Sequence, residues 1–258
     1  MKGVAMVVTV KKVVGFLDGA LDSSGFKDNS NNGLQVENSG RVGVVCCGVD
    51  ASLEFFKAAK ELGAGLLICH HGLSWGDSLK RITGLNYKRL SYLLRNDMAL
   101  YACHLPLDAH PKYGNNARIG SILGLKNMKP FGAYGGKPVG FIGRFPSAMG
   151  YPGFKELVRR KIAARITTTD FGGNTVRSVA VVSGGGTVDM DEAARIGVDV
   201  FLTGEPTLSA YHRAQDYGMN VVYAGHYATE TFGVKALGNL LRKKFRLQTE
   251  FVDLKTPF

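Results

Sequence analysis

Apolar residues recur along the chain with two spacings, and together these predict an alternation of amphipathic helices and short buried strands. Residues 9–21 place apolar side chains every three or four positions, which is typical of a helix. Residues 42–49 form an apolar run of strand length, a helical pattern follows over 52–62, and a second apolar run over 66–69 stops at two adjacent histidines. The order strand, helix, strand predicts a βαβ unit with parallel strands.

The same order recurs later in the chain. A strand is expected over 179–182, a helix over 189–196 that ends at Gly197, and a second strand over 200–202. Two further apolar runs, 98–103 and 221–224, also follow helix ends. The sequence therefore predicts an α/β fold of two similar domains with mainly parallel sheets.

The segment between the two halves is rich in glycine and proline and contains one obvious strand, over 139–145. We therefore expect a domain change near residue 128. Residues 1–127 and 220–258 are expected to form the first domain, and 128–219 the second. The remaining expected elements are a helix over 151–165, a final helix over 231–244 and a strand over 245–254.

Polar side chains that can bind metals follow the expected strands, and five of the six histidines lie there. In open α/β sheets, ligands collect at the carboxyl ends of the strands. A histidine pair alone would favour the simpler interpretation of one buried structural histidine beside one exposed one, but the other strand ends carry matching residues. The residues concerned are His70, His71, His104, Asp108, His110, His226 and Glu230.

Imidazoles and carboxylates without thiolates suit Zn, Fe, Mn, Co or Ni better than Mg or Ca. The set is large enough for two divalent metal ions with one bridging carboxylate. Strand alternation directs Cys69 and Cys103 away from this edge, so we expect them to be buried. Glu205, also at a strand end, could act as a general base or could cap a helix or form a salt bridge.

Composition adds limits on partners and location. The chain has 258 residues, and no apolar run is long enough for a signal peptide or a membrane span, so we expect a cytoplasmic protein without membrane contact. The net charge of +11 favours anionic partners such as nucleotides. The basic face of 151–165 and the cluster at 242–246 could bind nucleic acid. Along 151–165, however, no aromatic residues interleave as a stacking platform would need, which favours a solvated helix face there.

Several motifs in one order resemble the Nif-three-like family, whose members are commonly labelled GTP cyclohydrolase I type 2 homologs. The resemblance covers nearly the whole chain. It rests on five segments: Asn-Gly-Leu-Gln-Val at 32–36, His-His-Gly at 70–72, Tyr-Ala-Cys-His-Leu-Pro-Leu-Asp-Ala-His at 101–110 with Gly-Asn-Asn-Ala at 114–117, Leu-Thr-Gly-Glu at 202–205, and Gly-His-Tyr-Ala-Thr-Glu at 225–230.

The resemblance implies a dinuclear metal site in the cleft between the two domains and a homo-oligomer, a toroidal hexamer. Glu230 would be the bridging carboxylate, and His104 would lie behind the ligands or act as an acid/base near the metals. The chain lacks the domain that long members insert in their middle, so a sensing role is not carried over. The implied metal ligands are His70, His71, Asp108, His226 and Glu230.

Together these features favour a metal-dependent hydrolase that acts on a nucleotide-like or phosphorylated small molecule, with ring opening of the GTP cyclohydrolase type as the form that the family label suggests. His104 or Glu205 would transfer protons. The alternative is a metal storage or insertion protein, or a metal-stabilised oligomeric regulatory scaffold, without turnover. Nucleic-acid binding through the basic segments is a third hypothesis.

Overall fold

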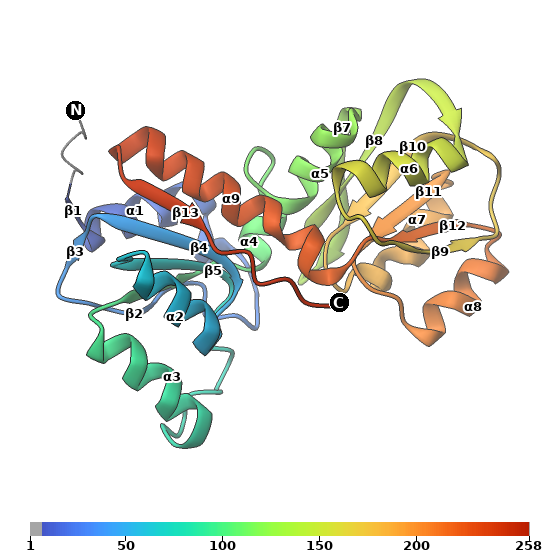
Figure 1. Cartoon of the computed structure of the whole chain (residues 1–258). Coiled ribbons are helices and arrows are strands. Elements are labelled where there is room, and N and C mark those ends of the chain that lie inside the picture. The colour runs from blue at the N-terminus through green and yellow to red at the C-terminus, as the bar shows by residue number, and fades with distance from the viewer. Residues whose placement is uncertain (1–6, 258) are drawn as a thin grey trace. The chain divides into compact units, whose positions relative to one another are not determined.

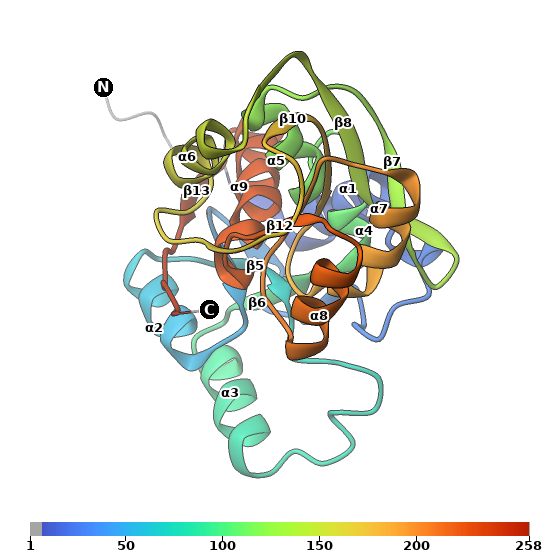
Figure 2. The same ribbon diagram turned by 90° about the vertical axis from the view of Figure 1, so that its right-hand side faces the viewer.

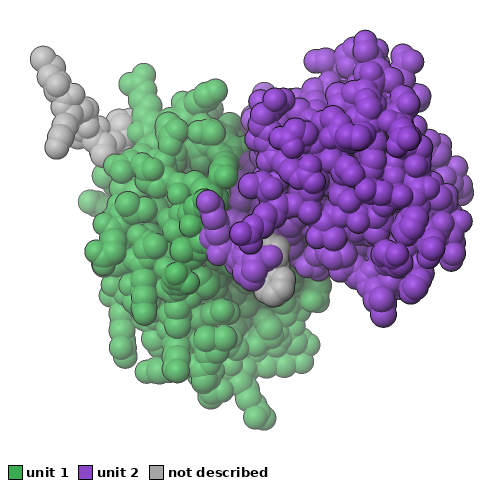
Figure 3. Space-filling view, turned by 45° about the vertical axis from the view of Figure 1, so that its right-hand side comes forward, with its two compact units in different colours: residues 1–107, 233–254 green, residues 108–232, 255–258 purple. Residues whose placement is uncertain are grey.

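The structure is a computed structural model that describes residues 7–257. The chain divides into two compact units, coloured separately in Figure 3. Unit 1 comprises Met1–Leu107 and Gly233–Leu254, and unit 2 comprises Asp108–Phe232 and Lys255–Phe258. These limits differ from the expected ones, since residues 108–127, 220–232 and 255–258, which were expected in the first domain, are assigned to unit 2.

Unit 1 is built on a five-stranded sheet whose strands lie in the order β13-β4-β5-β6-β2. The first four are mutually parallel, and only β2 runs antiparallel to its neighbour. β1 (Val8–Thr9) and β3 (Arg41–Val42) form a separate two-stranded antiparallel sheet. The sheet strands are β2 (Gly33–Val36), β4 (Val44–Asp50), β5 (Leu66–His71), β6 (Ala99–Ala102) and β13 (Gln248–Phe251).

Helices cover both faces of this sheet, which explains why its central strands are apolar on both sides. On one face α2 (Leu53–Glu61) and α3 (Gly84–Arg95) enclose a core with Leu67, Cys69 and Leu100. On the other lie α1 (Val10–Leu21) and the later part of α9 (His226–Phe245) (Figure 1). The expected helix over 9–21 is confirmed, with the Thr9 side chain accepting a hydrogen bond from the backbone of Lys12.

Unit 2 contains a six-stranded mixed sheet in the order β7-β8-β10-β11-β12-β9. Only β10, β11 and β12 are parallel neighbours, and the other pairs are antiparallel. The prediction of mainly parallel sheets is therefore correct for unit 1 and wrong for unit 2. The strands are β7 (Lys126–Tyr134), β8 (Lys137–Gly150), β9 (Thr167–Asp170), β10 (Thr175–Val182), β11 (Val200–Thr203) and β12 (Asn220–Tyr223).

Two of the three antiparallel pairs involve the segment for which one strand was expected, because β7 and β8 form an antiparallel hairpin there and β8 also pairs with β10. The third is the pair of β9 with β12. β7 is an edge strand that is largely exposed, so it shows little of the apolar alternation by which strands are recognised. An edge strand also tolerates Pro130, which could not donate a hydrogen bond inside a sheet. The glycine- and proline-rich segment that indicated a domain change thus forms the β7–β8 hairpin, with β7 at one edge of the unit 2 sheet.

The helices of unit 2 explain its extent. On one face of the sheet, Ile119 and Leu123 from α5 (Asn115–Leu123) share a core with Phe154 from α6 (Tyr151–Lys161). This core ties residues 115–123 to the second unit, although the sequence places them before the Gly/Pro-rich segment. The short α7 (Met190–Ile196) and α8 (Leu208–Asp216) pack against each other (Figure 2).

Short helical segments complete the chain at η1 (Ser23–Gly25), α4 (Leu105–Asp108) and η2 (Gly186–Asp189). Among the described residues, no helix is both long and apolar enough to cross a membrane.

Candidate metal centre

Two adjacent histidines, His70 and His71, form the carboxyl end of β5 in the unit 1 sheet. β5 lies between β4 and β6, and its residues 66–69 are fully buried, so the strand is fixed on both sides up to its carboxyl end. His70 is buried there, whereas the side chain of His71 is 21% exposed. The expected strand is confirmed, and it extends through both histidines.

Each of three histidines in unit 1 directs its Nδ1 atom at an oxygen acceptor. His70 Nδ1 lies 2.9 Å from the carbonyl oxygen of Cys103, at the end of the neighbouring strand. The Nδ1 atoms of His71 and His104 lie 2.9 Å from carboxylate oxygens of Asp50 and Asp28, respectively. A neutral imidazole that donates from Nδ1 carries its lone pair on Nε2, which is the atom that then serves as a metal ligand.

These three histidines form one group. Each offers a ring nitrogen, and these nitrogens lie within 4.8 Å of one another. The ring centroids of His70 and His71 are 4.8 Å apart, and those of His70 and His104 are 5.1 Å apart. Trp75 lies against the group, with its ring centroid 5.0 Å from that of His104 and its indole N–H donating to the Gly72 carbonyl oxygen. The group has the donor chemistry that a divalent transition metal requires.

Asp28 fixes His104 through a network of hydrogen bonds. Its carboxylate accepts from His104 Nδ1, from the Asn32 side chain and from the backbone N–H groups of Ser30 and Leu105. Burial by itself would raise the pKa of Asp28, but the hydrogen bonds from His104 and Asn32 outweigh it and lower the pKa to about 2. Asp28 is therefore ionised at neutral pH and holds the orientation of His104.

In unit 2, His226 and Glu230 lie on one face of α9. The helix begins at His226, five residues before its expected start, so the two side chains are four residues apart within one helix. His226 Nε2 lies 3.1 Å from Glu230 Oε1, and the Glu230 side chain is 4% exposed. The expected start at 231 was wrong because the glycine at 225 and the polar run after it look like a loop.

The Ser183–Gly184 turn connects Glu230 with Asp108 inside unit 2. Asp108 is buried, and its Oδ1 atom accepts hydrogen bonds from Ser183 Oγ at 3.0 Å and Asn115 Nδ2 at 2.8 Å. Gly184 follows at φ +59°, and a side chain there would overlap Glu230 Oε1. The Gly184–Gly186 turn thus leaves room for the Glu230 carboxylate, which is a structural reason for its first glycine.

Glu205 pairs with His226 instead of standing alone. Its Oε2 atom lies 3.0 Å from His226 Nδ1, so carboxylates face both ring nitrogens. The hydrogen bond to Glu230 is the largest cause, and that to Glu205 a further one, of a pKa of His226 raised to about 9. The salt-bridging role that the sequence left open for Glu205 is the one seen here, and its role as a base stays a prediction.

Other candidate residues have local roles. The ring of His110 accepts hydrogen bonds from the backbone of Lys112 and Tyr113, which closes a turn. Cys69 and Cys103 are fully buried, as expected, and burial raises the pKa of the Cys69 thiol well above its usual range.

Sequence reasoning missed the two carboxylates behind the histidines, Asp28 and Asp50. Asp50 is opposite His71 in the register of β4 and β5, so the rule that polar residues collect at strand ends would have found it. Asp28 lies in a polar loop and offered no such signal.

The sequence profile of the Duf34/NIF3 (NGG1p interacting factor 3) family matches residues 8–257. The chain belongs to this family, and the resemblance inferred from its motifs is confirmed. The matched range includes all the histidine and glutamate residues described above.

Relatives of similar length share the family label. A protein of Pyrococcus horikoshii named GTP cyclohydrolase 1 type 2 homolog is 44% identical over 246 residues, covering 95% of this chain and 98% of the relative. A protein of Archaeoglobus fulgidus with the same name is 42% identical over 249 residues, covering 96% and 99%.

Solved structures agree with the fold. TTHA1606 from Thermus thermophilus has a TM-score of 0.89 and 38% identity, covering 97% of this chain and all (100%) of that one. Reduced HcgD from Methanocaldococcus jannaschii has a TM-score of 0.86 and 28% identity, also covering 97% of this chain and 100% of that one.

Proposed function

We propose that the protein is a dinuclear metal-dependent hydrolase that acts on a nucleotide-like or phosphorylated small molecule, with chemistry of the GTP cyclohydrolase type that its relatives' name suggests. One observation carries the proposal: His70, His71 and His104 lie together, and the Nδ1 atom of each forms a hydrogen bond with an oxygen acceptor. Metal-binding histidines almost always have such an outer partner, which fixes the ring and makes Nε2 a better ligand.

The proposal draws ligands from both units. In unit 1 the donors are imidazoles, and in unit 2 they are an imidazole and two buried carboxylates, one of which, Glu230, we assign as the bridge. Zn, Fe, Mn, Co and Ni accept this mixture of nitrogen and oxygen ligands. We assign the two metals to His70, His71, Asp108, His226 and Glu230.

Two bound divalent metals supply Lewis acidity and a nucleophile at neutral pH. The chain's own residues provide the remaining functions. The ionised carboxylate of Asp28 accepts a hydrogen bond from Nδ1–H of His104, so that His104 Nε2 is left to accept and return a proton. Glu205 orients His226 from the opposite side of its ring. The net charge of +11 draws anionic substrates towards the protein.

The same ligands would serve a metal storage or insertion protein, or a metal-stabilised oligomeric scaffold, and turnover separates these alternatives from a hydrolase. The homohexamer and the cytoplasmic location remain predictions. Binding of nucleic acid also stays a prediction, although Lys155 on the basic helix is paired with Asp170 at 2.7 Å.

The test compares metal content per chain and metal-dependent hydrolysis of a nucleotide panel that includes GTP. The variants are His71→Ala and Glu230→Ala, with His212→Ala as control because that histidine is exposed on α8. We expect two metals in the wild type and the control, and loss of metal together with turnover in both ligand variants. Two metals without turnover of any substrate would favour metal handling, and undiminished metal in either ligand variant would refute the ligand assignment.

A further inference from the structure

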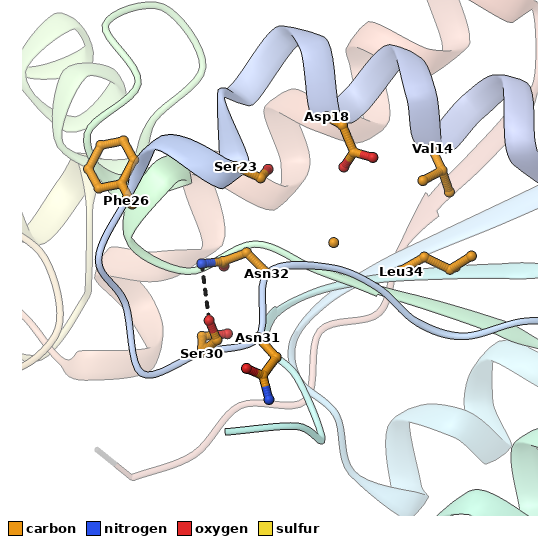
Figure 4. A pocket seen from close by; sticks show the side chains of 9 residues that line it. Val14, Asp18, Ser23, Phe26, Ser30, Asn31, Asn32 and Leu34 are labelled. Carbon is orange, nitrogen blue, oxygen red and sulfur yellow. Dashed lines mark hydrogen bonds between the residues drawn. The ribbon is translucent and has the colours of Figure 1, made fainter. Parts of the chain in front are cut away.

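A cavity of about 610 Å³ lies in unit 1, beside the histidine group but with a separate lining. It is open to solvent and is lined by residues of α1, η1 and the segment that leads into β2 (Figure 4). Its volume is that of a site for a small molecule. The lining residues are Val14, Asp18, Ser23, Phe26, Ser30, Asn31, Asn32, Gly33 and Leu34.

The charge of the lining selects the kind of ligand. The chain as a whole carries +11, yet none of the nine residues that line this cavity is basic, and one is a carboxylate. A phosphate or carboxylate ligand would find no cation in this lining. A ligand with N–H donors would find the carboxylate of Asp18, which points from α1 into the cavity (Figure 4).

The Asp18 carboxylate is held in place from one side. The hydroxyl of Tyr101, on the fully buried β6, donates to Asp18 Oδ1 at 2.9 Å, and Ser23 Oγ lies 3.3 Å from the same hydroxyl. Among the described residues, Asp18 forms no salt bridge. One buried donor therefore orients the carboxylate without neutralising its charge, which suits it to bind a cation or a pair of N–H groups.

A second polar group supports a ligand at this place. Ser30 lines the cavity and is 4% exposed, and its Oγ atom has no hydrogen-bond partner within residues 7–257. A buried hydroxyl of this kind costs stability unless something bonds to it. Gly33, at φ +112°, adds no side chain to the wall facing Asp18. Val14, Phe26 and Leu34 supply apolar surface for a flat or aliphatic body.

We infer that this cavity is a binding site for a small molecule with an amidine-type edge, in which adjacent N–H groups donate to Asp18 and an apolar or planar body lies against Val14 and Leu34. The guanine ring and guanidinium-bearing amines share this edge. The inference is independent of the proposed hydrolase, because no residue assigned to a metal lines the cavity.

The cavity is also linked to the histidine group. Asn32, in its wall, accepts a hydrogen bond from the backbone N–H of His104 at 2.7 Å and donates to Asp28, which holds the ring of His104. A ligand that contacts Asn32 should therefore shift the NMR resonances of the His104 ring without touching it.

The test is a calorimetric titration of chelator-treated protein with guanosine, inosine and agmatine. Inosine lacks the exocyclic amine, so it presents only one N–H at that edge. We expect guanosine or agmatine to bind. If the natural ligand is a nucleoside, guanosine should bind at least about tenfold tighter than inosine. If the natural ligand is a guanidinium-bearing amine, agmatine should bind tighter than guanosine.

The variants test the location. Asp18→Asn should weaken binding about tenfold or more, and Val14→Trp should abolish it by filling the cavity. Glu37→Gln, which makes the same chemical change at an exposed carboxylate, should leave binding unchanged. Absence of binding by both guanosine and agmatine, or equal binding to wild type and Asp18→Asn, would overturn the inference. Because the titration uses metal-free protein, failure of the hydrolase proposal would leave its result unaffected.

Discussion

Replacing Asp189 by asparagine should stabilise the protein at neutral pH. Asp189 is a buried carboxyl in η2 of unit 2, and a side chain at Gly132 would lie only 2.8 Å from its Cγ atom. Burial is the main cause of a pKa raised from 3.8 to about 6, the charge of Glu192 raises it further, and a hydrogen bond from the Ala133 backbone opposes the rise. The folded state thus holds this proton more tightly than the unfolded chain does.

The sign and size follow from linkage. The contribution of Asp189 to the free energy of unfolding is greatest below pH 3.8, falls as the pH rises, and is lost above about pH 6. A shift from 3.8 to about 6 corresponds to about 3 kcal/mol. Asparagine keeps an oxygen that can accept from Ala133 and cannot ionise, so the variant should avoid this loss.

The assay is urea unfolding of wild type and Asp189→Asn at several pH values between 4 and 8. The variant should be about 3 kcal/mol more stable above pH 6, and the difference should vanish towards pH 4. Comparing the two proteins at each pH cancels the titration of all other groups. A difference that does not change with pH, or a less stable variant at pH 7, would refute the reasoning.

Three further predictions concern the core and the candidate site. Phe154→Ala should lower the free energy of unfolding by about 3–5 kcal/mol, measured by urea unfolding, because the ring is fully buried in unit 2. Gly184→Ala should reduce bound metal with little change in circular dichroism, because the methyl group would overlap Glu230 Oε1. Asp28→Asn should lower turnover about 10–100-fold, measured by initial rates, because His104 loses the anionic partner that orients it for proton transfer. Full metal content in the glycine variant, or an unchanged rate in the aspartate variant, would contradict these assignments.

The sequence predicted the elements whose pattern is regular. Strand β5 and helix α1 show clear periods, and both were placed within one or two residues. The hairpin strand β7 was missed because it is exposed at an edge and interrupted by proline, so pairing with β8, and not an apolar pattern, specifies it. The start of α9 was missed for a related reason: its first turn carries polar side chains whose helical spacing is not marked by apolar residues.

The candidate site shows the same limit. The histidines at strand ends could be recognised because the chain has only six histidines and two of them directly follow the apolar run at 66–69. The carboxylates behind them could not all be recognised, because Asp28 reaches His104 from a loop 76 residues away in sequence. Long-range hydrogen bonds of this kind depend on how loops fold over the sheet, which no local pattern records.

The most direct test of the central claim is X-ray absorption spectroscopy, with metal analysis, of the metal-loaded protein and its Glu230→Ala variant. The proposal predicts two metals per chain, imidazole and carboxylate scattering, and a metal–metal distance of about 3.5–4 Å that disappears in the variant. Fewer than about 1.5 metals per chain without metal–metal scattering in fully loaded wild type would contradict a dinuclear centre.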